Sequence, residues 1–281
     1  MSYSLSRVLI VGCGAIGTQL AHKLSEQGHA VTGLKRHPPA SDGRIDYIAA
    51  DITSPADVAN ISGDFEYVFF ILSADGRTEK NYRDIYETGL QNMLNKFARQ
   101  RWFFVSSTSV YGQSKGEWVD ENSPARPANV TSQLIRQAER QVMDLSPLNI
   151  IVRFSGIYGP GRGHLLKMVR QQPLVQQQPP YFTNRIHQQD CVGILAFLFA
   201  QRLADMALEQ CYLASDDEPV PMWEVMSWLA DQMRCPAPAI KPADVGVSQN
   251  KRCNNQRLKA LGYQFYYPSY RDGYRGLLIH E

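Results

Sequence analysis

The sequence predicts an α/β fold with a doubly wound parallel sheet, followed by a smaller C-terminal substrate lobe. Two observations carry this prediction. Short runs of β-prone apolar residues alternate with helical patterns over the first half, and a glycine-rich turn directly follows the first of these runs. The chain has 281 residues, and 44% of them are hydrophobic, which is enough for a sizeable core.

The first strand is expected at 8–11 and leads into the glycine-rich motif Gly12–Gly17, with the sequence GCGAIG. Gly12 permits a tight turn, Gly14 lets the backbone approach a pyrophosphate, and Gly17 lets the next helix pack on the strand. The N-terminal N–H groups of that helix face the anion. The motif predicts a dinucleotide site on a Rossmann sheet. The alternative is a glycine-rich turn in an unrelated α/β protein.

The following elements alternate in the same way. A helix over 15–27 ends at Gly28, which suits the left-handed residue after a helix. The helix over 79–99 is the longest, with apolar residues three and four positions apart. The other strands are expected at 30–34, 46–49, 67–72, 102–106 and 149–153, and the other helices at 55–60 and 132–144.

The second half is less regular. Proline clusters at 173–180, 219–221 and 236–242 mark loops. A strand-like run at 210–214 indicates that the segment 184–215 returns to the first sheet. We therefore expect a dinucleotide-binding domain over 1–155, joined by 184–215, and a substrate lobe made mainly of 156–281.

Composition limits the partners. The formal net charge is +2, with acids and bases interspersed, so neither nucleic acid nor a membrane surface is an expected partner. The five cysteines stand in no C-x-x-C pair and in no metal-ligand spacing with histidine, so no metal site is expected. The polar start and the short apolar runs predict a cytoplasmic protein with a small-molecule substrate.

The end of the second strand bears on the choice of cofactor. A carboxylate there usually holds the ribose of NAD, whereas this chain has Lys35 and Arg36. Two cations suit a 2′-phosphate and favour NADP, with NAD as the alternative cofactor. In the simplest reading both side chains only point to solvent. After the third strand, Asp51 and Ile52 either flank the adenine or precede a helix at Pro55.

The run from Trp102 to Gly112 carries the second landmark, a cluster of hydroxyl side chains at 106–109. From Ser107 the run reads STSVYG, and it resembles the S-S-x-x-V-Y-G segment of extended short-chain dehydrogenase/reductases, the NAD(P)-dependent epimerase/dehydratase family. Further segments resemble family motifs in the same order over nearly the whole chain. They are Glu121–Pro124, Arg153–Gly161, Arg185–Asp190 and Leu258–Tyr263.

The resemblance implies cofactor and substrate positions. The expected cofactor residues are Gly12, Gly14, Ala15, Ile16, Gly17, Lys35, Arg36, Asp51, Ile52, Ser73 and Ser106. The expected catalytic residues are Ser107, Tyr111 and Tyr158, and the expected substrate contacts are Thr108, Arg153, Arg185 and His187.

Each of these residues has a plainer reading as well. Tyr111 and Tyr158 then serve the structure, and His187 is scaffolding before a helix with Asp190 as its N-cap. Arg153 and Arg185 each pair with a local carboxylate instead of an anionic substrate, and Glu121 fixes a loop.

The chain departs from the family where its proton chemistry lies. Members carry Y-x-x-x-K on the helix after the Ser/Thr strand, and aligning Ala138-Glu139 with the family's A-E places these slots at Thr131 and Ile135. Thr108 and Ser109 stand where family dehydratases have an acidic pair. The glycine loop is one residue shorter than the usual G-x-x-G-x-x-G. The chain therefore resembles an atypical member.

Three functional interpretations remain open. The first is an NADP(H)-dependent epimerase/dehydratase-like oxidoreductase with a substitute acid/base. The second is a catalytically silent NAD(P)-binding or redox-sensing protein. The third, a hydroxyacid-dehydrogenase type of enzyme, requires an all-helical second half. The family resemblance also implies a homodimer that is paired through the helices at 79–99 and 132–144.

Overall fold

The computed structural model describes residues 5–41, 43–242 and 249–279. The chain forms two compact units, each described by itself. The first unit comprises Met1–Val110, Pro127–Arg153 and Val192–Tyr212, and the second comprises Tyr111–Arg126, Phe154–Cys191 and Leu213–Glu281. Residues 111–126, which lie within the range expected for the dinucleotide domain, thus cluster with the second unit.

A seven-stranded sheet forms the centre of the first unit, with the strand order β12-β7-β5-β4-β1-β2-β3. Its strands are β1 (Arg7–Val11), β2 (Ala30–Lys35), β3 (Asp46–Ala49), β4 (Tyr67–Phe70), β5 (Arg101–Ser107), β7 (Ile150–Phe154) and β12 (Cys211–Ala214). The pairs from β3 through β5 are parallel. The chain winds outward from β1 to β3, then resumes on the other side of β1 at β4, so the switch in strand order lies beside β1.

Apolar residues on both sides of the strands explain why this sheet is buried on both faces. Phe69 stacks on Phe103 at 4.5 Å between ring centres, and both meet Phe199 edge-on. Their neighbours Phe70 and Phe104 point the opposite way and stack at 5.5 Å. Since successive strand residues alternate between faces, two aromatic layers form, one on each side of the sheet.

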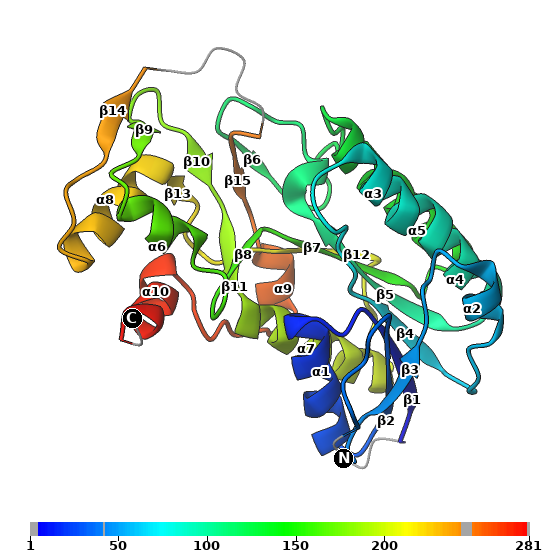
Figure 1. Cartoon of the computed structure of the whole chain (residues 1–281). Helices are drawn as coiled ribbons and strands as arrows, with labels where there is room; N and C mark the ends of the chain where they lie inside the picture. The colour runs from blue at the N-terminus through cyan, green and yellow to red at the C-terminus, as the bar shows by residue number, and fades with distance from the viewer. Residues whose placement is uncertain (1–4, 42, 243–248, 280–281) are drawn as a thin grey trace. The chain divides into compact units, whose positions relative to one another are not determined.

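Helices flank this sheet (Figure 1). They are α1 (Ala15–Glu26), α2 (Pro55–Ala59), α3 (Glu79–Arg83), α4 (Leu90–Lys96), α5 (Val130–Leu145) and the part of α7 (Gln188–Leu203) from Val192 onward. The expected stop of α1 is confirmed, because Gly28 has φ +94°. The side chains of Ser54 and Asn129 cap α2 and α5 by accepting backbone N–H groups.

The helix expected over 79–99 forms, but it is neither uniform nor as long. A π-helical stretch, η1 (Asp84–Gly89), lies between α3 and α4, and α4 ends at Lys96. A Cβ at Gly89 would overlap the side chain of Ile52. The π-helical turn places the backbone of Gly89 directly against the side chain of Ile52. Helical periodicity in the sequence does not predict this tertiary contact.

The second unit contains short strand pairs and helices. The strands are β6 (Glu117–Val119), β8 (Gly156–Tyr158), β9 (Leu174–Gln176), β10 (Phe182–Thr183), β11 (Arg185–His187), β13 (Val220–Pro221), β14 (Ala239–Lys241) and β15 (Lys251–Cys253). The helices are α6 (His164–Val169), α8 (Met222–Gln232), α9 (Gln256–Ala260) and α10 (Tyr270–Leu278). One core cluster joins α6, α8 and α10 around Tyr158, Val225, Leu229 and Tyr274.

The strands of the second unit contradict the all-helical second half that the hydroxyacid-dehydrogenase interpretation requires, and so they remove that interpretation. The expectation that Asp190 is the N-cap of a helix is wrong. Helix α7 begins at Gln188, so Asp190 lies in its first turn and is not its N-cap. The Asp190 carboxylate accepts the hydroxyl of Tyr263 and the backbone N–H groups of Tyr266 and Tyr267 instead. No helix in the described part of the chain is long and apolar enough to span a membrane.

Candidate functional site

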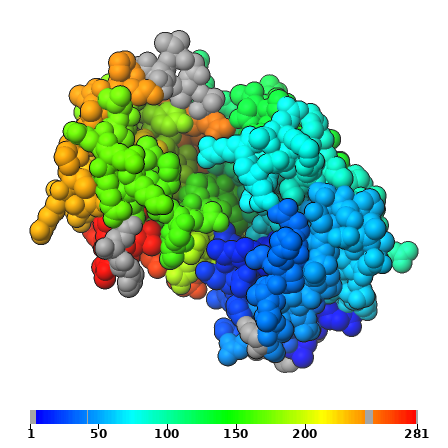
Figure 2. Space-filling view, in the orientation of Figure 1, coloured from blue at the N-terminus to red at the C-terminus, as the bar shows by residue number. Residues whose placement is uncertain are grey.

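A cavity of about 410 Å³ opens in the first unit at the carboxyl ends of β1, β2 and β4. Its walls come from five segments, residues 12–14, 34–37, 50–53, 71–75 and 81–85. In the space-filling view the blue and cyan surfaces that carry these segments adjoin one another (Figure 2). Ligands of such sheets bind at this edge, at the switch in strand order, so the cavity lies where a dinucleotide is expected.

The glycine loop forms one wall of the cavity. Gly12 has φ +103°, and a Cβ at Gly17 would overlap the carbonyl oxygen of Gly12, so both positions require glycine. A Cβ at Gly14, in contrast, would meet nothing within 4 Å. No side chain caps α1, and its first turn holds no acid. The open loop and the uncapped positive end of the helix fit an anionic pyrophosphate.

Cys13 belongs to the glycine loop, and its side chain is buried. Its thiol contacts the Ile10 carbonyl oxygen at 3.6 Å, and burial raises the pKa of Cys13 to about 11. The thiol is therefore protonated at neutral pH and not poised as a nucleophile.

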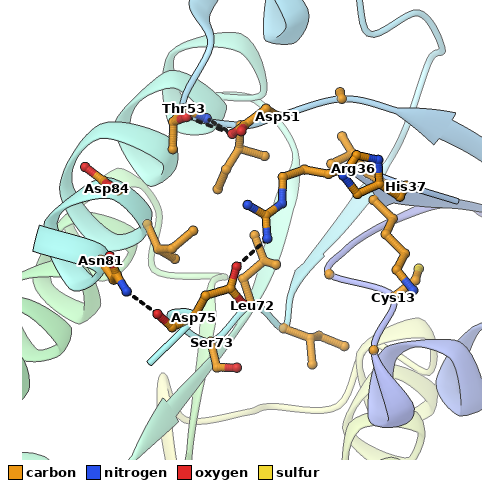
Figure 3. A pocket seen from close by; sticks show the side chains of 18 residues that line it. Cys13, Arg36, His37, Asp51, Thr53, Leu72, Ser73, Asp75, Asn81 and Asp84 are labelled. Atoms are coloured by element: carbon orange, nitrogen blue, oxygen red, sulfur yellow. Dashed lines mark hydrogen bonds and ion pairs between the residues drawn. The ribbon is translucent and has the colours of Figure 1, made fainter. Parts of the chain in front are cut away.

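The end of β2 supplies the cations of the cavity. Lys35, Arg36 and His37 line it, and Arg36 reaches across to form an ion pair with Asp75 from the loop after β4 (Figure 3). The hydrogen bond and the charge of Asp75 raise the pKa of Arg36. Arg36 therefore already has a counter-ion in this structure. The sequence allowed a phosphate contact or a solvent-exposed side chain, and it did not predict this ion pair.

Asp51 stands just before α2, as one of its two interpretations from the sequence expects, whereas its contact with an adenine stays a prediction. It lines the cavity, and its Oδ1 accepts the backbone N–H and the hydroxyl of Thr53, at 2.9 and 2.8 Å. The N-cap of α2 is Ser54. Asp51 therefore stabilises the approach to α2 from a position that also faces the cavity (Figure 3).

The expected cofactor residues divide into two groups. Those on the cavity wall are Gly12, Gly14, Lys35, Arg36, Asp51, Ile52 and Ser73. Those outside it are Ala15, Ile16, Gly17 and Ser106. Ala15, Ile16 and Gly17 belong to the first turn of α1, whereas Ser106 is buried at the end of β5.

Ser106 belongs to a buried polar network around Glu139. The Ser106 hydroxyl donates to Glu139 Oε1 at 2.6 Å, and the Arg153 guanidinium donates to both carboxylate oxygens at 2.8 Å. Arg136 adds a third donor at 2.7 Å. Arg153 therefore has the local carboxylate partner that was the alternative to substrate binding, and sequence reasoning did not identify Glu139 as that partner.

The hydroxyl cluster and the family's proton-handling slots lie on β5, η2 (Thr108–Val110) and α5, which packs against both. The Ser107 hydroxyl oxygen accepts the N–H of Ser109 at 3.1 Å, and Thr108 is buried. Thr131 donates its hydroxyl to Asn129 at 2.8 Å. Ile135 is buried, so the lysine slot holds no cation.

The remaining candidates lie inside the second unit. Tyr111 is fully buried and donates its hydroxyl to the carbonyl oxygen of Asp120 at 2.7 Å. Tyr158 stacks on Tyr274 at 4.6 Å, and burial raises the pKa of Tyr158 well above its usual value. A phenolate is therefore disfavoured at Tyr158.

His187 and Arg185 are buried as well. Burial lowers the pKa of His187 to about 4, and its Nδ1 accepts the N–H of Gln189 at 3.2 Å, so the ring is neutral. The Arg185 guanidinium donates to Thr183 at 2.5 Å and lies over the Tyr270 ring at 5.3 Å. The charge of Arg185 acts to lower the pKa of Asp216, but burial of that carboxyl raises its pKa well above the usual value.

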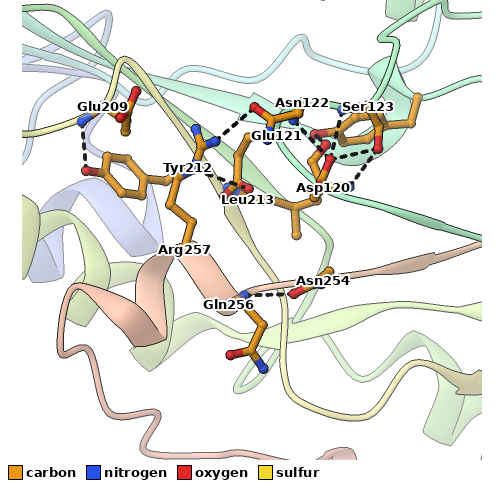
Figure 4. A network of polar contacts seen from close by, with 11 residues as sticks. Asp120, Glu121, Asn122, Ser123, Glu209, Tyr212, Leu213, Asn254, Gln256 and Arg257 are labelled. Carbon is orange, nitrogen blue, oxygen red and sulfur yellow. Dashed lines mark hydrogen bonds and ion pairs between the residues drawn. The ribbon is translucent and has the colours of Figure 1, made fainter.

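Glu121 fixes a loop, as one reading of the sequence anticipated. Its carboxylate accepts the N–H of Leu213 at 2.7 Å and lies 3.6 Å from Arg257 (Figure 4). The neighbouring Asp120 closes a turn by accepting from Asn122 and Ser123. These contacts give the loop a structural role in the second unit.

Several cavity residues were not predicted from the sequence. They include His37, Thr53, Leu72, Asp75, Asn81, Asp84 and Ile85. Asp75 was within reach, since it lies two residues beyond Ser73 at the same edge of the sheet. Asp84 and Ile85 come from the π-helical stretch, which the sequence did not predict.

Comparison with known proteins agrees with this geometry. The model of the NAD-dependent epimerase/dehydratase family matches residues 8–201. A solved protein from Methylobacillus flagellatus, assigned to the NAD-dependent epimerase/dehydratases, is 37% identical, with 99% of each chain covered and a TM-score of 0.85. Protein YeeZ of Escherichia coli K12 is 25% identical over 69% of this chain and 73% of its own.

A UDP-glucose 4-epimerase from Thermus thermophilus, solved with NAD, shares the fold. The TM-score is 0.76 at 19% identity, with 98% of each chain covered.

Proposed function

The chain belongs to the NAD-dependent epimerase/dehydratase family, and on that basis we propose that it is an NADP(H)-preferring oxidoreductase with a degenerate tyrosine–lysine pair. The observation that carries the proposal is the cavity where an open glycine loop faces Arg36 and Lys35. Its substrate is a small molecule, and nucleotide-sugars are the first class to test.

The chain's own residues would hold the cofactor in a definite way. The loop at Gly12 and Gly14 and the first turn of α1 would receive the pyrophosphate, and Arg36 and Lys35 would receive the 2′-phosphate. A carboxylate is absent from the end of β2, where NAD-specific proteins usually hold the ribose. When bound, the nicotinamide supplies hydride transfer.

Proton transfer is where this chain is weakest. In the family a tyrosine assisted by a lysine moves the proton, and a positioned acid/base contributes about 10²–10⁴-fold to the rate. Here Thr131 replaces the tyrosine, and its hydroxyl is too weak an acid near neutral pH. Ile135 offers no charge to assist it. Ser107 would still donate its hydroxyl to a substrate carbonyl, so substrate orientation would outlast the lost proton transfer.

A second candidate is a catalytically silent protein that binds NAD(P) and responds to its occupancy. The specific observation in its favour is the burial of every substitute acid/base considered. Tyr111 donates to a backbone carbonyl, Tyr158 lies in a hydrophobic core, and His187 is buried and neutral. If Tyr158 acts in catalysis, it does so as an acid and not as a phenolate base, because burial raises its pKa.

An assay of NADPH oxidation with nucleotide-sugars and small carbonyl compounds tests the proposal. We expect slow turnover that Ser107→Ala abolishes and that the double variant Thr131→Tyr/Ile135→Lys raises, with urea unfolding checked because Ile135 is buried. Ser109→Ala removes a neighbouring hydroxyl and is the matched control.

Fast turnover that is indifferent to Ser107→Ala would place the chemistry elsewhere. NADPH binding without any turnover would favour the silent protein.

A further inference from the structure

Arg36, the cation that we expect to bind the 2′-phosphate of the cofactor, already pairs with a carboxylate of the cavity, Asp75. Arg36 and Asp75 stand 39 positions apart in the chain and form an ion pair across the opening of the cavity (Figure 3). Both side chains are mostly exposed, 57% for Arg36 and 77% for Asp75. An ion pair this exposed to solvent is weak, so Arg36 exchanges it readily for a stronger partner.

The backbone holds Asp75 at this place independently of Arg36. Gly76 turns the chain at φ +84°, and the side-chain amide of Asn81 donates to the Asp75 carbonyl oxygen. Thr78 then caps α3 by accepting the N–H of Asn81. The Asp75 carboxylate is therefore presented to the cavity by a braced loop, and only its charge depends on Arg36.

The other carboxylates on the cavity wall have different partners. Asp51 accepts from Thr53, and Asp84 pairs with Lys80 at 2.6 Å. Within the described residues, Asp75 is the carboxylate in direct contact with Arg36. Asp84 therefore provides a matched carboxylate on the same wall that does not touch the cation.

We propose that Asp75 is a specificity-determining residue, which competes for Arg36 and so limits the preference for a 2′-phosphorylated dinucleotide. This inference rests on the proposed function. A 2′-phosphate must displace Asp75 from Arg36 and then lies beside a like charge. A ribose hydroxyl needs no cation and meets no repulsion. Asp75 thus weakens NADPH binding and leaves NADH binding nearly unchanged, which keeps both cofactors within reach of one site.

Calorimetric titration of the full chain with NADPH and with NADH tests this inference. Asp75→Asn removes the charge and keeps the size of the side chain. We expect it to raise the affinity for NADPH about threefold to fivefold, a gain of the size expected from an exposed ion pair, and to change the affinity for NADH less than about twofold. Asp84→Asn removes a carboxylate from the same wall and should change the NADPH affinity less than about twofold.

A second background isolates the Arg36 contact. In Arg36→Gln the gain from Asp75→Asn should shrink, because Asp75 then has no guanidinium to compete for and only its repulsion of the 2′-phosphate remains. An unchanged NADPH/NADH ratio in Asp75→Asn, an equal gain in Asp84→Asn, or an undiminished gain in Arg36→Gln would each overturn the inference and leave the proposed function standing. Failure of the unmodified chain to bind either cofactor would overturn both.

Discussion

Glu139 on α5 and Arg153 on β7 form a two-pronged ion pair in the interior of the first unit. Nε and Nη2 of Arg153 each lie 2.8 Å from a carboxylate oxygen, and the side chains are 0% and 4% exposed. Ser106 and Arg136 donate to the same carboxylate. The contacts of Glu139 thus tie α5, which carries the two altered family slots, to β7 and to β5, which carries Ser107.

Breaking this pair should destabilise the fold strongly. Arg153→Ala leaves Glu139 buried without its main counter-ion, so we expect the free energy of unfolding to fall by about 3–5 kcal/mol. Arg136→Ala removes a more exposed donor from the same carboxylate and should cost less than about 1 kcal/mol. Urea unfolding compares the two. Equal small losses would show that the buried pair is not a main support of α5.

The glycine loop separates folding from binding. A methyl group at Gly17 meets the Gly12 carbonyl, so Gly17→Ala should destabilise the fold by about 1–3 kcal/mol. A methyl group at Gly14 points into open space, so Gly14→Ala should fold with a loss below about 1 kcal/mol. It should still weaken NADPH binding at least about tenfold, since backbone approach to the pyrophosphate is blocked. Unfolding curves and cofactor titrations measure the two effects, and unchanged binding in Gly14→Ala would remove this loop from the site.

His187 should make stability depend on pH. Burial lowers the pKa of His187 to about 4 in the fold, against about 6.5 in the unfolded chain. Above pH 6.5 both states are neutral and the contribution is complete. Between pH 6.5 and 4 only the unfolded state takes up the proton, so stability falls by up to about 3 kcal/mol.

His187→Phe should show a smaller loss over this window in urea unfolding at pH 7.5, 5.5 and 4.5. His29, whose pKa burial also lowers, titrates in both proteins and cancels in the comparison. Parallel losses in both proteins would mean that the histidine is not held neutral.

Assembly is a separate prediction. We expect an isologous homodimer through the helical segment from Glu79 to Lys96 and through α5, the pairing that the family resemblance of the sequence implies. Val130 and Leu145 expose apolar surface at the two ends of α5. Light scattering at micromolar concentration measures the mass, and a monomer would reject this prediction.

The sequence predicted the parts of the fold that local pattern controls. The strands of the first sheet follow apolar runs, and α1 lies between the glycine loop and Gly28. Both follow from the sequence because hydrophobic periodicity and glycine positions are local features of neighbouring residues. The π-helical stretch was not predictable in this way, since it depends on the approach of Gly89 to Ile52. The two- and three-residue strands of the second unit are too short to show a period.

The cavity was predictable only in part, for a related reason. Residues adjacent to a strand end, such as Gly14, Arg36 and Ser73, follow from the strand assignment alone. Asp75 and Glu139 act through partners 39 and 14 positions away in the chain, so their roles appear only once the fold brings the charges together. The sequence therefore indicated the cations Arg36 and Arg153 but not the carboxylates that pair with them.

Titration of the unmodified chain with NADPH and with NADH tests the central claim most directly, with cofactor fluorescence as the readout. Even with Asp75 competing, one charge-assisted contact to the 2′-phosphate is worth about 1.5–3 kcal/mol. NADPH should therefore bind about tenfold more tightly or better, and Arg36→Ala should abolish that preference. Equal affinities for the two cofactors, or NADPH binding unaffected by Arg36→Ala, would contradict the account.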